Sequence, residues 1–202
     1  QRPAGLKRIG FLGTETASGY ASNVEALRAG LRDLGYVEDK NIAIEFRWAD
    51  GKYERLPDLA AELVRLKVDV IVTHGTPGTS AAKQATTTIP IVMATVGDPV
   101  AMGLVASLAK PGGNVTGSAT FTAELMGKRV ELLKEAVPRI ALVAVLANAN
   151  NPSRRADSVV IGDAAKFKLL KVGLHPIEVG GPGEFKSAFA ALAKKRVDAI
   201  VV

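Results

Sequence analysis

Polar side chains follow three short apolar runs of the sequence. Thr14, His74 and Asp98 each lie at or shortly after the end of such a run. If these runs are parallel strands, their carboxyl ends meet at one edge of a sheet, where helices begin with free backbone N–H groups. Those N–H groups and the helix dipole favour an anion such as a carboxylate. We therefore expect a small-molecule site at this edge.

The candidate ligand-binding residues are small, polar or aromatic, and they lie near the expected strand ends. They are Thr14, Ser18, Tyr20, His74, Gly75, Thr76, Thr79, Ser80, Asp98, Phe121, Asn148 and Asn150. A helix cap is the alternative role for Thr76 and Asp98, because each precedes a proline suited to the first helical position. Asp98 would otherwise pair with a ligand ammonium group.

The aromatic and imidazole candidates also have structural alternatives. Tyr20 and Phe121 would stack on an aromatic ligand or pack in the core. His74 would donate a hydrogen bond to a ligand or serve only the local structure, and no second metal ligand is near it in the sequence. Asn148 and Asn150 would offer amide groups to a ligand. We expect no metal site and no cofactor.

The apolar spacing predicts strands that alternate with helices in the first half of the chain. The residues 42–48 alternate, with Ile42, Ile44 and Phe46 on one face, which is typical of a strand near a sheet edge. Expected strands are 7–13, 41–48, 68–73 and 89–94 with a short fifth after 112–117, and expected helices are 24–34 and 55–67, with two more beginning at Thr76 and Asp98.

The alternation restarts after Ser118, so we expect a domain boundary there, with domains at 1–118 and 119–202. The helix 122–136 would bury Leu125, Leu132 and Leu133. Further expected elements are strands at 140–146, 174–179 and 197–202 and helices at 152–171 and 183–195. Because the sequence stops within an apolar strand, we expect the second lobe to be incomplete.

Composition excludes several kinds of protein. The net charge is +6 from 26 basic and 20 acidic residues, but the basic residues lie on separate helices without a nucleic-acid-binding motif, so no nucleic acid partner is expected. The sequence has no cysteine, which excludes disulfides and thiol catalysis. It also lacks the G-x-G-x-x-G, P-loop, H-E-x-x-H and G-x-S-x-G motifs.

Four stretches of the sequence are similar to one family. They are Leu27–Gly51, Leu56–Val72, Ala85–Gly117 and Glu124–Pro138. The chain resembles the periplasmic solute-binding proteins of ABC transporters, in the branch associated with tryptophan and tyrosine uptake.

That resemblance implies an α/β protein with the type I periplasmic binding fold, in which two Rossmann-like lobes with parallel sheets hold a small ligand in the cleft between them. It implies about 100 residues more than this chain has. It also implies no catalysis, an ABC permease as the membrane partner, and a periplasmic or extracellular location, with a membrane anchor as an option. The expected ligand is an amino acid, aromatic ones included, or a small carboxylate.

Two other classes of protein are alternatives, and the first of them shares this fold. A ligand-sensing regulatory core would add a helix-turn-helix before residue 7. A Rossmann-like transferase would need an acid/base pair in the cleft, for which Asp98 with His74 is the candidate couple.

Overall fold

A computed structural model describes residues 6–120, 122–151 and 170–202 of the chain. The backbone contacts divide it into two compact units, residues 1–120 and 121–202. The expected helix 152–171 and the candidate Phe121 fall mainly or wholly outside the described residues. No helix of the described part is long and apolar enough to cross a bilayer.

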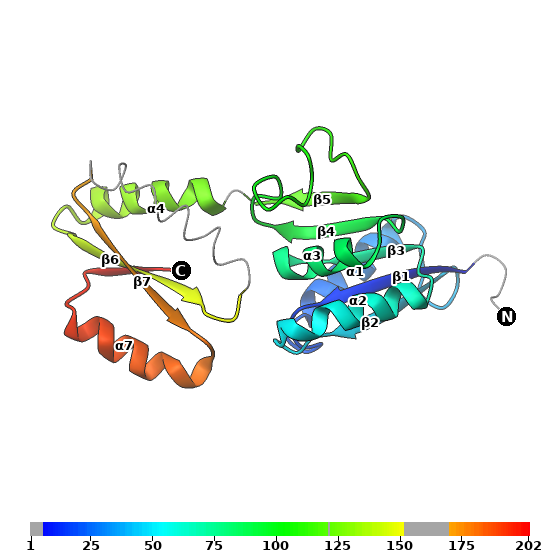
Figure 1. Cartoon of the computed structure of the whole chain (residues 1–202), viewed down its shortest axis with the longest axis horizontal. Helices are drawn as coiled ribbons and strands as arrows, with labels where there is room; N and C mark the ends of the chain where they lie inside the picture. The colour runs from blue at the N-terminus through cyan, green and yellow to red at the C-terminus, as the bar shows by residue number, and fades with distance from the viewer. Residues whose placement is uncertain (1–5, 121, 152–169) are drawn as a thin grey trace. The chain divides into compact units, whose positions relative to one another are not determined.

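Five parallel strands form the sheet of the first unit, in the order β2-β1-β3-β4-β5 (Figure 1). They are β1 (Lys7–Gly13), β2 (Ile42–Trp48), β3 (Val70–Thr73), β4 (Ile91–Val96) and β5 (Val115–Ala119). The chain leaves β1 for β2 on one side and then returns to β3 on the other side. In open α/β sheets such a change of direction opens a crevice at the carboxyl ends of the two central strands, which are β1 and β3 here.

Helices cover both faces of this sheet. They are α1 (Ala21–Asp33), α2 (Leu56–Arg65), preceded by the short 3-10 helix η1 (Tyr53–Arg55), and α3 (Gly75–Ala85). On one face α2 and α3 lie side by side (Figure 1). Gly10 of β1 has no side chain there, which leaves room for Leu63 of α2: a Cβ on Gly10 would lie 3.1 Å from it. Leu12, on the same face, is fully buried with Leu63.

The opposite face of the sheet carries an aromatic cluster beside α1. The rings of Phe11, Phe46 and Trp48 lie with centroids 5.2 to 5.8 Å apart. The Trp48 ring fills the space beside Gly13, where a Cβ would lie 2.2 Å from a ring carbon.

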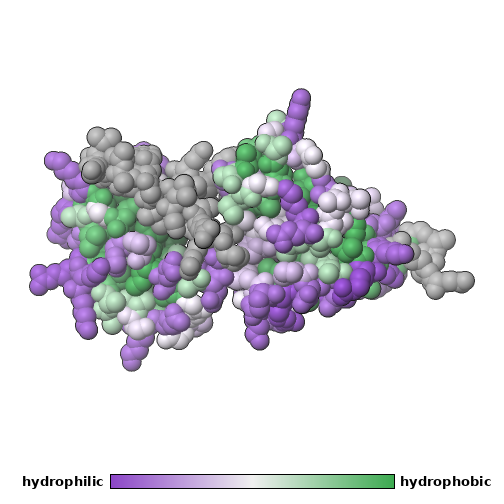
Figure 2. All heavy atoms as spheres, in the orientation of Figure 1, coloured by the Kyte–Doolittle hydropathy of each residue, from purple (hydrophilic) through white to green (hydrophobic). Residues whose placement is uncertain are grey.

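Hydrophilic side chains dominate the lower edge of the first unit as Figure 2 draws it. The expected place of β2 at the sheet edge is confirmed. Its burial does not alternate, since Ile42 is buried and the residues 43–48 are all half-buried.

The second unit has three parallel strands in the order β7-β6-β8. Its elements are α4 (Thr122–Ala136), β6 (Leu142–Asn148), β7 (Gly173–Val179), η2 (Pro182–Glu184), α7 (Phe185–Lys194) and β8 (Ala199–Val201). In α4, Val130 and Leu133 pack in the core, whereas Leu125 and Leu132 are exposed. The expectation that Leu125 and Leu132 are buried was wrong. Val130 and Leu133 are three residues apart and share the face of α4 that packs, and Leu125 and Leu132 lie outside that face.

Both units use an aspartate to hold the start of a central strand. In the first, the backbone N–H of Arg8 donates to Oδ2 of Asp69 at 2.8 Å. In the second, the N–H groups of Ala141 and Leu142 donate to Oδ2 of Asp198 at 2.8 and 2.9 Å. The carboxylate therefore satisfies N–H groups at the amino edge of each sheet, opposite the expected ligand edge.

Two expected helix starts were wrong. The helix α3 begins at Gly75 with His74 in the N-cap position, so Thr76 lies inside the first turn and is not the cap. Gly75 adopts a φ of 68°, which turns the chain into the helix directly after β3 and before the Thr-Pro pair.

The segment after Asp98 is a turn and not a helix. Asp98 Oδ1 accepts the N–H groups of Val100 and Ala101, both at 3.0 Å, as a cap does. The turn ends at Gly103, whose φ is 66°. A left-handed residue so soon after the cap prevents the helix from continuing.

Candidate functional site

Thr14 and His74 connect the ends of the two central strands of the first unit. The backbone N–H of Thr14 donates to Nε2 of His74 at 3.2 Å, and the Thr14 hydroxyl oxygen lies at the same distance from that nitrogen. Both residues are buried. The turns after β1 and β3 are thus held together at the crevice that the strand order predicts.

Tyr20 completes this cluster from the turn before α1. Its hydroxyl lies 2.5 Å from Nδ1 of His74, and the two rings are stacked with centroids 3.9 Å apart. The Trp48 ring is 6.3 Å from the Tyr20 ring. We call Thr14, Tyr20 and His74 the switch-point cluster. The structure thus brings together three of the residues expected at the site.

The segment that positions Tyr20 is a short hydroxyl-stabilised turn. Thr16 Oγ1 accepts the backbone N–H of Gly19 at 3.1 Å, and the N–H of Tyr20 donates to the Thr16 carbonyl at 3.2 Å. Ser18, an expected ligand residue, is exposed and contacts Thr16 through its hydroxyl at 3.2 Å. Thr16 therefore forms the turn that positions Tyr20.

Burial sets the charge state of His74. Desolvation lowers the pKa of the imidazole from 6.5 to about 4. The ring is therefore neutral near pH 7, where a neutral imidazole offers one acceptor and one donor nitrogen. Burial, with a smaller contribution from the nearby Glu15 carboxylate, raises the pKa of Tyr20, so its phenol stays protonated.

The start of α3 lies next to His74 and presents two free backbone donors. In the described part of the chain, the N–H groups of Gly75 and Thr76 have no hydrogen-bond partner, and Pro77 has no N–H. Thr76 is 8% exposed. An anion would be favoured at these groups by the helix dipole.

The first turn of α3 packs tightly against the strand ends. A Cβ on Gly78 would lie 2.4 Å from Oγ1 of Thr73. That buried hydroxyl donates to the Leu12 carbonyl at 2.9 Å and so ties β3 to β1. The hydroxyl of the expected ligand residue Thr79 donates instead to the Gly75 carbonyl at 2.9 Å. Ser80, next on the helix, is half-buried.

Asp98 lies at the end of β4, one strand away from the central pair. Its side chain is exposed and holds its own turn through Oδ1. No contact joins Asp98 to His74 among the described residues, so the acid/base couple that a transferase would need does not form there.

The two asparagine candidates in the second unit hold their own loop. Asn148 Oδ1 accepts the backbone N–H of Asn150 at 2.9 Å, and the Asn150 amide donates to the Gly180 carbonyl at 2.7 Å. They lie at the carboxyl end of β6, the central strand of that unit. Their amides are thus partly used inside the unit, and their ligand role stays a prediction.

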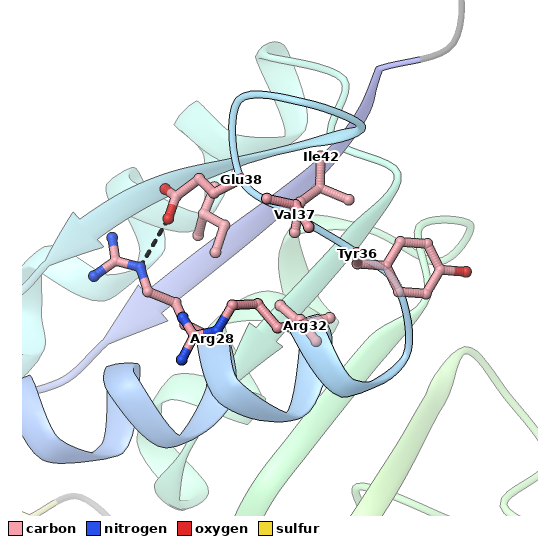
Figure 3. Close-up of a pocket in the computed structure, with 8 residues that line it drawn as sticks. Arg28, Arg32, Tyr36, Val37, Glu38 and Ile42 are labelled. Carbon is pink, nitrogen blue, oxygen red and sulfur yellow. Dashed lines mark hydrogen bonds and ion pairs between the residues drawn. The ribbon is translucent and has the colours of Figure 1, made fainter.

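Two open pockets lie along α1. One, of about 300 Å³, is apolar and lies beside the turn before α1, where Ala17, Phe46 and Trp48 contribute to its lining. The other, of about 110 Å³, lies between the end of α1 and the start of β2 (Figure 3). There Arg28 donates to Glu38 at 2.7 Å and to Glu25 at 2.8 Å, so its charge is already paired. This second pocket is at the amino edge of the sheet, opposite the switch-point cluster.

Thr16, Thr73 and Glu15 are also parts of this region, although none of them was expected there. The signal for Thr16 was a threonine three residues before Gly19, which is typical of a hydroxyl-stabilised turn. A threonine as the last residue of a buried strand was the signal for Thr73. No sequence signal placed Glu15 near Tyr20. No group of three or more potential metal ligands gathers within the described ranges.

The fold is that of the type I periplasmic binding proteins. The chain belongs to the family of ABC transporter substrate binding proteins, whose family model matches residues 16–202. This is a family of substrate-binding proteins and not of enzymes.

The relatives of the chain are longer than the chain itself. It is 37% identical over 147 residues to the tyrosine-binding protein of Clostridioides difficile (strain R20291), a match that covers 71% of this chain and 42% of that protein. A conserved domain protein from Vibrio cholerae has a TM-score of 0.80 at 28% identity, over 96% of this chain and 64% of the other. An ABC domain from Streptococcus pneumoniae in complex with L-Trp has the same TM-score and coverage at 27% identity. The chain thus spans less than two thirds of each of these relatives.

Proposed function

We propose that this chain is part of the binding component of an ABC importer, and that it captures an amino acid, aromatic ones included, or another small carboxylate. The ligand carboxylate would bind at the switch-point cluster and the start of α3. The observation that carries the proposal is the joining of Thr14 and Tyr20 to His74 beside the two free N–H groups of α3.

The chemistry of this region supports a carboxylate. Two backbone N–H groups on a helix start form a partially positive site without a titratable cation. The His74 ring is neutral near pH 7, so the attraction for an anion here comes from these N–H groups. The relatives support the class of ligand, since one is a tyrosine-binding protein and another is in complex with L-Trp.

The wider role rests on the family. We propose that the full-length protein lies in the periplasm or on the outer surface of the cell, with a membrane anchor as an option, and delivers its ligand to an ABC permease. Asn148 and Asn150 remain the candidate ligand residues of the second unit. A ligand would stabilise a closed form only if it bound that form more tightly than the open one.

A panel of amino acids and small carboxylates, measured by thermal unfolding of the full-length protein, tests the proposal. A ligand that binds only the native state raises the unfolding midpoint by mass action. We expect L-tyrosine, L-tryptophan or a related carboxylate to raise it and to be recovered unchanged. Chemical turnover of the ligand would favour a transferase, and no shift with any compound would contradict the proposal.

A further inference from the structure

The hydrogen bonds around His74 fix which ring nitrogen carries the proton. The backbone N–H of Thr14 is always a donor, so Nε2, 3.2 Å from it, must accept. A neutral imidazole that accepts at Nε2 carries its proton on Nδ1. His74 is therefore the Nδ1–H tautomer.

That tautomer determines the direction of the next hydrogen bond. Nδ1–H donates to the Tyr20 hydroxyl oxygen, 2.5 Å away. A phenol that accepts a hydrogen bond still has its own proton to donate. Among the described residues, no other hydrogen-bond partner of this hydroxyl is found. The Tyr20 ring is held in place by stacking on His74 and is only half-buried.

We propose that Tyr20 is a specificity-determining residue whose hydroxyl donates its proton to an acceptor atom of the ligand, and that the chain Thr14–His74–Tyr20 fixes this direction. The hydroxyl proton then favours a ligand with an oxygen acceptor at this point, such as a carboxylate oxygen, over one with an ammonium group there. This inference rests on the proposed function, since it assigns a role within the same site.

The first test is direct and needs no ligand. Proton–nitrogen correlation NMR of the imidazole rings in the full-length protein distinguishes the two neutral tautomers, and the signals lost in His74→Gln assign His74. We expect the Nδ1–H tautomer at neutral pH. The Nε2–H tautomer, or an imidazolium, would overturn the inference.

The second test compares ligand analogues on Tyr20→Phe, a change that removes the hydroxyl and keeps the stacked ring. The probes are L-tyrosine and L-tryptophan, together with indole-3-propionate, which keeps the carboxylate and lacks the ammonium group. Loss of a hydrogen bond to a charged acceptor should weaken each bound probe about ten-fold or more. The matched control is Tyr36→Phe, at an exposed tyrosine in the pocket of Figure 3.

The outcomes separate this inference from the proposed function. If the native protein binds a probe and Tyr20→Phe binds it equally well, Tyr20 is not a ligand donor and the inference is wrong. If Tyr20→Phe weakens binding of the two amino acids but not of indole-3-propionate, the hydroxyl faces the ammonium group and the inference is also wrong. If the native protein binds none of the three probes, the ligand role of Tyr20 fails, whereas the wider panel of amino acids and small carboxylates decides the proposed function. The tautomer measurement still decides the hydrogen-bond direction.

Discussion

The backbone N–H of Thr14 donates to Nε2 of His74 across 3.2 Å, joining the turn after β1 to the start of α3. This bond crosses the point at which the strand order of the first unit changes direction. It also uses the acceptor nitrogen of the imidazole and leaves the donor nitrogen for Tyr20. This one hydrogen bond therefore joins the two turns and determines that His74 presents its donor nitrogen to Tyr20.

His74 should make the native state sensitive to acid. Its pKa falls from 6.5 to about 4 on folding because the ring is desolvated, so the unfolded chain binds a proton more readily between these values. Stability is therefore lost as the pH falls, by about 2 kcal/mol from about pH 7 to pH 5. Urea unfolding of the native protein and of His74→Gln at both pH values measures this. Between these pH values, the free energy of unfolding of His74→Gln should fall by about 2 kcal/mol less than that of the native protein. An equal fall in the two proteins would contradict the burial of a neutral His74 ring.

Gly78→Ala should destabilise the first unit by about 1–3 kcal/mol, because its Cβ would meet the buried Thr73 hydroxyl at 2.4 Å. Gly30→Ala is the matched control: Gly30 is also in a helix, but a Cβ there has nothing within 4 Å. It should stabilise the protein by about 0.5–1 kcal/mol. Denaturant unfolding of both variants gives the comparison. If Gly78→Ala and Gly30→Ala change the free energy of unfolding by the same amount, α3 is not tightly packed against the strand ends.

Thr76→Val should weaken binding of a carboxylate ligand by about 1–3 kcal/mol, since it replaces a buried hydroxyl at the start of α3 with a methyl group of the same shape. Calorimetric titration of the full-length protein with L-tyrosine measures the loss. The control is Thr116→Val, at an exposed position of β5. Unchanged affinity in Thr76→Val would leave that hydroxyl without a ligand role.

Asp198→Asn should destabilise the second unit near neutral pH. The backbone N–H of Ala141, followed by that of Leu142, lowers the pKa of Asp198 below its ordinary value of 3.8. The stabilising contribution of the carboxylate is therefore complete above that value and is lost as the pH falls through the lower folded value. Thermal unfolding of the native and variant proteins across the acidic range should show their midpoints converging. A gap that is constant with pH would show that the charge of Asp198 is not involved.

Most of the fold could be predicted from the sequence, because its apolar runs have the period of either a strand or a helix. The helix at 122–136 and the strand at 7–13 have the bounds that periodicity predicts. The helix expected after Asp98 failed for a local reason. A cap followed by proline predicts how a helix starts, but Gly103 ends the turn before a second one can form. The same cap rule misplaced the start of α3, where Gly75 allows an earlier entry.

The site was less predictable because it depends on contacts between distant segments. Thr14, Tyr20 and His74 could be named from their places after strands, yet nothing in the sequence indicates that His74 bonds to both of the others. The hydrogen bonds that these polar side chains make within their own loops could not be predicted from the sequence either. Asn148 and Asn150 are partly used by their own turn, and Asp98 caps a turn on a neighbouring strand.

The most direct test is a crystal structure of the full-length protein with an L-amino acid that raises its unfolding midpoint. The account predicts a carboxylate oxygen within hydrogen-bond distance of the N–H groups of Gly75 and Thr76, with the Tyr20 hydroxyl donating to the ligand. A ligand bound with its carboxylate elsewhere, for example in the Arg28 pocket of Figure 3, would contradict it.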